Sequence, residues 1–328
     1  MEKKQLLLTV AGYGGHSGYA YAVLYELAKL GFRDNIIVIA KEYDFLVEKF
    51  RSFGLVKTLT LPRRPGEPLY RGVHRWIKSL FESTNLISRF HIGSVFATGS
   101  NLSITPSILA KLIRGASVFT MEAIEHFKKP SRSIKIIEKT GGVVLLHWDE
   151  QLEMYPKGIV VGPVYEPPIY EPRDEGYILV TTGTLGYKEL FDAISEINPS
   201  KVVLQTGDIS PNHYIGRHPD WVVFKYTSDI HRWLAGASIV ITQQGVTAAT
   251  ARLGYDKPVI IVYNPRVTLG APRRDIELYA EKLNAIFLDK PDPKALRSAV
   301  ESMGKPSKKY PQGSRRVAEM LIEHLKHH

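Results

Sequence analysis

The chain contains no cysteine among its 328 residues. This absence excludes a disulfide framework, thiolate metal sites and a cysteine nucleophile, and it is compatible with a reducing compartment. No apolar run approaches the roughly 18 residues of a membrane-spanning helix. The first apolar run, QLLLTVA over residues 5–11, ends at glycines and is too short for a signal peptide. We therefore expect a cytoplasmic protein that does not cross a membrane.

Acidic residues are fewer than basic ones, 33 against 43, which gives a formal net charge of +10. Such an excess favours polyanionic partners: nucleic acid, an anionic membrane face or phosphate-bearing small molecules. The basic residues are dispersed through the chain without the interleaved aromatics of RNA-binding domains, so we expect no nucleic-acid partner. With 44% hydrophobic and 23% charged residues, the composition is that of a soluble globular protein.

Short apolar runs alternate with helix-period segments along most of the chain. The strands expected in the first half are residues 5–11, 35–40, 94–98, 117–121, 143–146 and 158–161. Four prolines follow within ten positions: Pro163, Pro167, Pro168 and Pro172. Because proline disfavours helix and sheet interiors, we expect residues 166–176 to form a linker. After the linker, strands are expected at 177–182, 201–206, 221–226, 238–243, 258–263 and 285–288.

This βα alternation predicts an α/β fold with two doubly wound, Rossmann-like domains that face each other across a cleft. The N-terminal domain is expected to cover residues 1–165 and the C-terminal domain residues 177–312. Residues 313–328 are expected to form a helix that packs back on the N-terminal domain.

Glycines and a histidine occupy the first strand-to-helix turn, AGYGGHSGYA over residues 11–20. The dinucleotide pattern G-x-G-x-x-G, counted from Gly12, meets Ser17 at its last position and so fails by one residue. Glu42 and Asp44 after the second strand could mimic a ribose-binding acid, which leaves an NAD site open. His16 is expected to stay neutral beside the positive helix end and to serve as a general base; the alternative is a histidine that only caps the turn.

The GGHSG loop resembles the glycine-glycine-histidine loop of GT-B glycosyltransferases that build lipid-linked sugars. These are the two-subunit N-acetylglucosamine transferase of dolichol-linked oligosaccharide synthesis and its bacterial lipid II-forming relative. TMEAIEHFKKPSRS (120–133) and LLHWDEQLEMYPKGIVVGPV (145–164) are similar to the membrane-anchoring subunit of the dolichol enzyme. ILVTTGTLGYKELFDAI (178–194), VVLQTGD (202–208) and ASIVITQQGVTAATARLGYDKPVIIV (237–262) are similar to its donor-binding subunit. The chain thus resembles a fusion of both subunits.

The resemblance implies an inverting, metal-independent transferase. The enzyme would move a sugar from a UDP-sugar to a polyprenyl- or dolichyl-diphosphate-linked acceptor, as in N-glycosylation. N-acetylglucosamine is the best guess for the sugar. It implies no cofactor, and the chain has no D-x-D motif for a divalent cation. His16 is the expected base, with Glu122 as its competitor or helper. The residues expected to bind the donor or its phosphates are Gly14, Gly15, Thr182, Gly183, Thr184, Gln244, Gly245, Val246, Thr247, Arg273, Arg274 and Asp275.

Two positions depart from the pattern of the family. Ala251 stands where the donor half usually has a ribose-binding glutamate, and Ile276 stands where it usually has a glutamine. Arg266, Arg273 and Arg274 are expected to compensate by pairing with the diphosphate. The departures leave two alternatives open: a non-catalytic protein that binds a nucleotide sugar or a lipid, and a sugar-nucleotide epimerase of the same architecture.

The segment LPRRPGEPLYRGVHRWIKSLF (61–81) combines an apolar helical face with a basic border. We expect it to bind the anionic cytoplasmic face of a membrane and the acceptor lipid; the alternative is a helix that packs on its own sheet. The residues assigned to this contact are Arg71, Arg75, Trp76, Ile77 and Leu80. The expected partners are a nucleotide-sugar donor, a lipid-linked acceptor and an anionic membrane, and the oligomeric state stays open, a homo-oligomer included.

Overall fold

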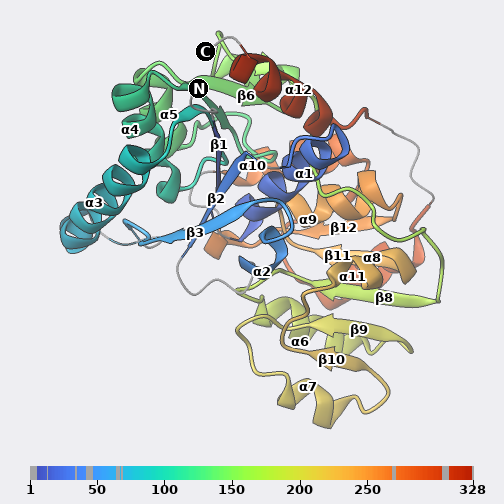
Figure 1. The fold of residues 1–328 in the computed structure, drawn as a ribbon. Coiled ribbons are helices and arrows are strands. Elements are labelled where there is room, and N and C mark those ends of the chain that lie inside the picture. The colour runs from blue at the N-terminus through green and yellow to red at the C-terminus, as the bar shows by residue number, and fades with distance from the viewer. Residues whose placement is uncertain are drawn as a thin grey trace. The chain divides into compact units, whose positions relative to one another are not determined.

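The computed structural model describes residues 6–12, 14–33, 35–41, 47–63, 67, 69–267, 271–304 and 310–326. The chain forms two compact units, residues 1–164 together with 311–328, and residues 165–310 (Figure 1). Glu42 and Asp44, the acids considered above for an NAD site, lie outside the described residues.

A seven-stranded parallel sheet forms the centre of the first unit, because its short apolar runs are buried on both faces. The spatial order is β3-β2-β1-β4-β5-β6-β7, so β1 lies between β2 and β4. The strands are β1 (Leu6–Gly12), β2 (Ile36–Lys41), β3 (Leu55–Leu59), β4 (Ile92–Ala97), β5 (Ser117–Met121), β6 (Val143–Leu146) and β7 (Ile159–Val160). Strand β3 is absent from the strands expected above, because its sequence LVKTL includes Lys57 and Thr58 and it lies at the sheet edge, where polar side chains reach solvent.

Helices cover both faces of this sheet. Helices α3 (Val73–Arg89), α4 (Ile104–Arg114) and α5 (Arg132–Lys139) enclose one apolar core with the strands, and α1 (Gly15–Lys29) packs against α12 (Gly313–Lys326) on the other face. The C-terminal helix therefore belongs to the first unit, where Arg316 Nη1 donates to Val160 O at 2.8 Å. The shorter helices are α2 (Val47–Phe50), η1 (Leu69–Gly72), η2 (Asn101–Ser103) and η3 (Asp149–Glu153).

The second unit repeats the architecture with a six-stranded parallel sheet in the order β10-β9-β8-β11-β12-β13. Its strands are β8 (Tyr177–Thr181), β9 (Val202–Gln205), β10 (Val222–Phe224), β11 (Ala237–Thr242), β12 (Val259–Val262) and β13 (Ile286–Leu288). Its helices are α6 (Lys188–Ile197), α7 (Asn212–Arg217), α8 (Ile230–Gly236), α9 (Val246–Ala249), η4 (Thr250–Gly254), η5 (Pro265–Val267), α10 (Arg273–Leu283) and α11 (Pro293–Glu301). Helices α6, α7 and α11 share one core with the sheet.

The expected linker is extended and lies on the second unit. Arg173 N and Glu175 N each donate at 2.8 Å to the end of α8, at Ala235 O and Gly236 O. Farther back, Glu166 Oε2 lies 2.8 Å from Nε2 of the buried His231. These contacts place residues 165–176 with the unit that follows them.

Candidate functional site

Each sheet has one point at which the chain order reverses, between β1 and β4 in the first unit and between β8 and β11 in the second. Loops that leave the carboxyl ends of the two strands at such a point run to opposite faces of the sheet, and the opening between them is where doubly wound folds bind ligands. His16 follows β1, Thr182 to Thr184 follow β8, and Gln244 to Val246 follow β11. His16 and the predicted loop residues of the second domain thus lie at these two points, whereas Glu122 follows β5 and Arg273 to Asp275 follow β12.

His16 stands at the second position of α1 and is tied to the neighbouring strand. Its Nδ1 lies 2.6 Å from Thr98 O, directly after β4. Because a carbonyl oxygen only accepts, Nδ1 is the donor, and the neutral ring therefore has its lone pair on Nε2. Burial lowers the pKa of His16, against the hydrogen bond to Thr98, which raises it. His16 is thus neutral near pH 7, and burial rather than the helix end is the main cause.

Gly14 shapes the turn that positions His16. It has φ 57° and ψ −131°, a conformation that side chains other than glycine rarely adopt, and a Cβ at this position would meet no atom of the protein within 4 Å. Glycine is needed here for its backbone conformation and not for packing. Gly15, the first residue of α1, is exposed beside it.

Glu122 lies at the carboxyl end of β5, next to β4, and is fully buried. Its Oε1 accepts from Ala123 N at 2.8 Å and from Ser131 Oγ, and its Oε2 accepts from Tyr155 Oη at 2.6 Å and from Ser131 N at 3.0 Å. His126 Nδ1 lies 3.2 Å from Oε1. Both carboxylate oxygens therefore already accept hydrogen bonds inside the protein.

This environment makes Glu122 a weak base. Burial alone would raise its pKa, but the hydrogen bond and charge of His126, together with the hydrogen bonds of Ser131 and Tyr155, lower the pKa of Glu122 to about 2. Ser131 and Glu122 both contact the same ring nitrogen of His126, Nδ1, so the group is not a serine-histidine-acid relay, which needs both nitrogens. Of the two predicted candidates, the geometry favours His16 as the base and Glu122 as a residue that holds its loop.

Buried side chains beyond β6 fix the rest of this loop. Gln151 Nε2 donates to Ala123 O at 2.9 Å and to His126 O at 2.8 Å. Trp148 Nε1 donates to Ile124 O at 2.9 Å, while Ile124 N donates to Tyr19 Oη on α1 at 3.0 Å. Sequence reasoning did not select Gln151 or Tyr19, because a single glutamine or tyrosine in a helix gives no signal until the fold places it.

A second buried histidine, His147, closes the carboxyl end of β6. Its Nε2 lies 2.9 Å from Glu122 O, and its Nδ1 accepts from Val164 N at 3.0 Å. Both ring nitrogens are thus used by the backbone, and burial lowers the pKa of His147 to about 4. His147 is a neutral structural histidine.

The corresponding edge of the second unit has no carboxyl group, histidine, lysine or arginine in the loops 182–186, 243–246 and 263–265. Gln243, Gln244 and Asn264 form a closed amide network: Gln244 Nε2 donates to Asn264 O at 2.8 Å, and Asn264 Nδ2 donates to Gln243 Oε1 at 2.7 Å. Gln243 Nε2 in turn donates to Thr182 O at 2.7 Å, which joins the loops after β8, β11 and β12. Asn264 and Gln243 were not among the predicted residues, although Gln243 is the last residue of one predicted strand and Asn264 directly follows the next.

One hydroxyl of this edge lacks a partner among the described residues, and two of its glycines border open space. Thr182 Oγ1 is buried and has no hydrogen-bond partner among the described residues. Gly245 has φ 128° and ψ −176°, a conformation almost restricted to glycine, and a Cβ there would meet nothing within 4 Å. Gly183 likewise has open space where a Cβ would be, and Thr184 and Thr247 are partly exposed beside these glycines. The edge therefore offers hydroxyl and backbone N–H groups to a ligand.

The arginines expected to bind the diphosphate lie in η5 and at the start of α10, where Asp275 also lies. Arg273 pairs with Asp289 and Arg274 with Glu277 at 2.9 Å, whereas Arg266 pairs with Glu189. These arginines are at least half exposed, so the pairs are weak, but the described contacts direct them to carboxylates of the protein. Asp275 and Ile276 are fully buried in the first turn of α10, and Ala251 is fully buried in η4.

The first turns of helix α3 expose most of their apolar residues and bury the small polar Ser79, whereas Leu86 and Ile87 near the end of the helix are buried in the core. Ile77 is 64% and Phe81 73% exposed, with Val73 and Leu80 about half exposed. The buried side includes Ser79, whose Oγ lies 2.8 Å from Thr105 Oγ1 on α4. Packing against its own unit therefore does not explain the apolar face. Among the described residues no helix is long and apolar enough to span a membrane.

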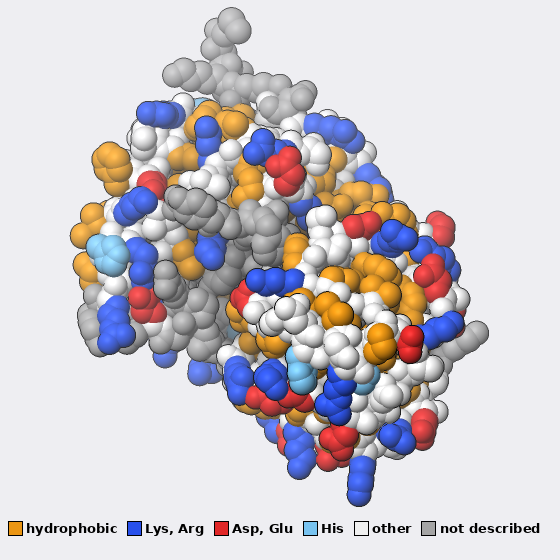
Figure 2. All heavy atoms as spheres, turned by 90° about the horizontal axis from the view of Figure 1, so that it is seen from below, with side chains coloured by type: hydrophobic (Ala, Val, Ile, Leu, Met, Phe, Trp, Pro, Cys, Tyr) orange, Lys and Arg blue, Asp and Glu red, His pale blue; other side chains and the backbone are white. Residues whose placement is uncertain are grey.

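Arg71 and Lys78 are exposed on this helix or directly before it, Trp76 is partly exposed, and Arg75 pairs with Glu67. On the face of the molecule drawn in Figure 2, by contrast, lysine and arginine side chains alternate with acidic ones and form no continuous basic patch.

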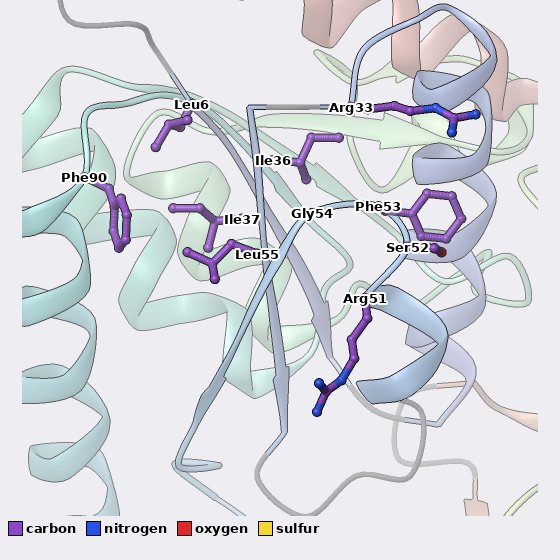
Figure 3. A pocket seen from close by; sticks show the side chains of 10 residues that line it. All are labelled: Leu6, Arg33, Ile36, Ile37, Arg51, Ser52, Phe53, Gly54, Leu55 and Phe90. Carbon is purple, nitrogen blue, oxygen red and sulfur yellow. The ribbon is translucent and has the colours of Figure 1, made fainter.

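A cavity of about 540 Å³ opens at the opposite, amino edge of the first sheet (Figure 3). Apolar residues at the starts of β1, β2 and β3 line it, including Leu6, Ile37 and Leu55. The side chains of Arg33 and Arg51 extend away from this apolar group. The cavity is therefore separate from the edge that holds His16, and it has no converging polar groups.

No protein-family model matches the chain. A search of characterised proteins finds the UDP-N-acetylglucosamine–N-acetylmuramyl-(pentapeptide) pyrophosphoryl-undecaprenol N-acetylglucosamine transferase of Caldicellulosiruptor saccharolyticus. The two chains are 21% identical over 320 residues, which cover 86% of this chain and 84% of the relative.

Solved structures with the same architecture include two glycosyltransferases and an epimerase. MurG of Acinetobacter baumannii superposes with a TM-score of 0.66 at 14% identity over 98% of this chain and 99% of its own. The glycotransferase of kitacinnamycin gives a TM-score of 0.69 at 13% identity over 98% and 100%. UDP-GlcNAc 2-epimerase of Neisseria meningitidis, bound to UDP-GlcNAc, gives 0.61 at 14% identity over 99% and 100%. The two parallel-sheet units thus form the GT-B fold.

Proposed function

We propose that the protein is an inverting glycosyltransferase that moves N-acetylglucosamine from UDP-GlcNAc to a polyprenyl-diphosphate-linked acceptor. The observation that supports this most is the similarity, over 86% of the chain, to an N-acetylglucosamine transferase whose acceptor is a pyrophosphoryl-undecaprenol. The chain would unite acceptor and donor functions that the dolichol enzyme divides between two subunits.

His16 acts as the base in this proposal. Its Nε2 takes the proton of the acceptor hydroxyl while that oxygen attacks the anomeric carbon, and the bond to UDP breaks with its electron pair leaving on the diphosphate. A positioned base of this kind contributes roughly 10²–10⁴-fold in rate. Burial keeps His16 neutral, which the proton acceptor requires.

The loops after β8 and β11 hold the diphosphate. Thr182 Oγ1, which has no partner among the described residues, and the backbone near Gly183 and Gly245 supply hydrogen-bond donors to its oxygens. No metal is needed in this scheme, because donors fixed in place before the reaction stabilise the developing charge. The exposed Arg273 and Arg274 of α10 bind the diphosphate in this scheme only if their ion pairs with Asp289 and Glu277 open.

The first unit attaches to the cytoplasmic face of the membrane through the apolar face of α3, next to the acceptor lipid. The exposed Ile77 and Phe81 enter the interface, and Arg71 and Lys78 meet anionic headgroups.

An epimerase is the second candidate, because a UDP-GlcNAc 2-epimerase has the same fold. Epimerisation at a sugar carbon requires an acid and a base at the donor, and the loops 182–186, 243–246 and 263–265 contain neither acid nor histidine. The transferase therefore fits the side chains of the second unit better.

One experiment separates these functions. Calorimetric titration with UDP-GlcNAc, UDP and NAD is followed by incubation of labelled UDP-GlcNAc with either a polyprenyl-diphosphate N-acetylglucosamine or a polyprenyl-diphosphate muramyl pentapeptide. We expect UDP-GlcNAc but not NAD to bind, and label to reach one of the two lipids. Conversion of the labelled donor without any acceptor would identify an epimerase, and donor binding with no turnover would identify a binding protein.

The membrane proposal has its own test in sedimentation with vesicles that contain phosphatidylglycerol. Ile77→Ser with Phe81→Ser should weaken vesicle binding at least about tenfold, since each buried side chain contributes roughly 1.5–3 kcal/mol. Ile215→Ser with Val222→Ser, which removes two exposed apolar residues of the second unit, is the matched control. Equal losses in both double variants would argue against α3 as the contact.

A further inference from the structure

The loop between β5 and α5 contains a second carboxyl group, that of Glu125, which the proposed chemistry does not use. Its Oε2 is covered by protein atoms and has no hydrogen-bond partner among the described residues. Glu122, three residues earlier, has both oxygens bonded. A buried polar atom without a partner costs on the order of 1–3 kcal/mol. The described contacts of the folded chain therefore leave this oxygen without the partner that would offset the cost of its burial.

The position of Glu125 is fixed by the protein on both sides. The hydrogen bonds of Gln151, Trp148 and Tyr19 described above hold the backbone of residues 123, 124 and 126. The side chains of Ile124 and Phe127 are buried in the unit. The missing hydrogen bond of Oε2 thus belongs to a rigid turn, which is how binding groups are held ready for a ligand.

Glu125 and His16 belong to the same edge of the sheet. Tyr19 lies between them on α1, with its ring edge-on to His16 at a centroid distance of 6.4 Å and its hydroxyl at Ile124 N. Burial raises the pKa of Glu125, which the charge of His126 opposes. The titratable groups that act on Glu125 come from its own loop and from α1, namely Glu122, His126 and Tyr19.

We propose that Glu125 binds a hydroxyl group of the acceptor sugar at the sheet edge that also holds His16, and that this hydroxyl supplies the hydrogen bond that Oε2 lacks. The inference rests on the proposed transferase function and adds a residue that selects and orients the acceptor. The carboxyl group has an acceptor oxygen in either protonation state, so the contact does not depend on its charge. Glu125 then acts in binding, while the proton of the attacking hydroxyl goes to His16.

The first test measures the binding of a short-chain polyprenyl-diphosphate sugar. The ligand is the acceptor that receives label in the transfer assay. If neither lipid receives label, both acceptor lipids of that assay are tested in turn. Glu125→Ala should weaken acceptor binding about tenfold or more, and Glu125→Gln less, because a lost hydrogen bond to a charged group is worth roughly 1.5–3 kcal/mol. UDP-GlcNAc binding should stay within about twofold of wild type. Glu150→Gln, an exposed acid of the same unit, is the matched control.

The outcomes separate this inference from the proposed function. Acceptor binding without transfer in the wild type contradicts the transferase and still tests Glu125 through the variants. Unchanged acceptor affinity in Glu125→Ala, or no acceptor binding by the wild type, overturns the role of Glu125.

A second measurement excludes a purely structural role. Because Oε2 has no partner, Glu125→Gln should be at least as stable as wild type in urea unfolding. A raised pKa in the folded state makes the wild type lose stability as pH rises above about 4.5, so the advantage of Glu125→Gln should grow from pH 4.5 to pH 8. A variant that is destabilised by more than about 1 kcal/mol would show that Glu125 holds the fold, and would overturn the proposal.

Discussion

The turns after β1 and β8 occupy equivalent places in the two units, and both are rich in glycine, yet their surroundings differ. Around the turn of the first unit lie His16, Glu122, Glu125 and His147, whose pKa values are all moved from their ordinary range. Around the turn of the second unit lie Thr182 and the amide network of Gln243 and Asn264, which do not titrate.

In the proposed function, the same backbone geometry serves two different chemistries. Proton transfer requires groups that change charge near neutral pH, and burial in the first unit shifts the pKa values of such groups. Holding a diphosphate requires fixed dipoles, and neutral side chains with glycine backbone provide them without a competing proton equilibrium. If this division is correct, variants of the first unit should change rate and pH dependence, whereas variants of the second should change donor affinity.

The largest expected effect is that of His16→Ala. Loss of the base should lower kcat about 10²–10⁴-fold with donor affinity unchanged, measured by steady-state transfer and by titration with UDP-GlcNAc. Because the pKa of His16 is lowered, wild-type activity should fall only on acidification below about pH 6.5, and this acid limb should vanish in the variant. His91→Ala, an exposed histidine of the same unit, should leave both quantities unchanged. A parallel loss of donor binding in His16→Ala would break the division between the units.

Glu122→Gln should act on stability rather than on chemistry. The lowered pKa of Glu122 means that its ionised form stabilises the fold above about pH 4.5 by about 3 kcal/mol, and that this contribution is lost as pH falls toward 2. In urea unfolding the variant should therefore be about 3 kcal/mol less stable at pH 7, and the difference should shrink between pH 4.5 and pH 2.

The control for Glu122 is Glu153→Gln, which removes an exposed acid paired with Lys128 and should cost less than about 1 kcal/mol. A stable Glu122→Gln protein that has lost the activity of the wild type would instead assign Glu122 to the chemistry.

The smallest of the three effects is expected for Gly245→Ala. An alanine at φ 128° and ψ −176° costs about 1–3 kcal/mol and turns the N–H groups of the loop, so the affinity for UDP-GlcNAc should fall. Gly216→Ala, at an open position of α7 with ordinary φ, should be neutral in both stability and binding. Donor affinity that survives in Gly245→Ala would remove this loop from the proposed diphosphate site.

The sequence by itself determined the architecture. Buried parallel strands read as continuous apolar runs, and runs separated by helix-period segments with a proline-rich interruption predict two doubly wound units. The strands expected in the second half correspond to β8–β13, and only the edge strand β3, with its polar positions, gives no such signal. The glycine-histidine turn could also be predicted from the sequence. The positive φ of Gly14 (57°) and the place of His16 at the start of a helix both depend on neighbours along the chain.

The tertiary structure decided which side chains can react. Glu122 and Glu125 are alike in the sequence and lie three residues apart. In the folded protein Ser131, Tyr155 and His126 contact the carboxylate of Glu122, whereas Oε2 of Glu125 has no hydrogen-bond partner among the described residues. Likewise, the apolar stripe of α3 could have packed on the sheet until the contact of Ser79 with Thr105 placed it outward. Periodicity and turn chemistry depend on neighbours along the chain, whereas proton affinity and exposure depend on neighbours in space.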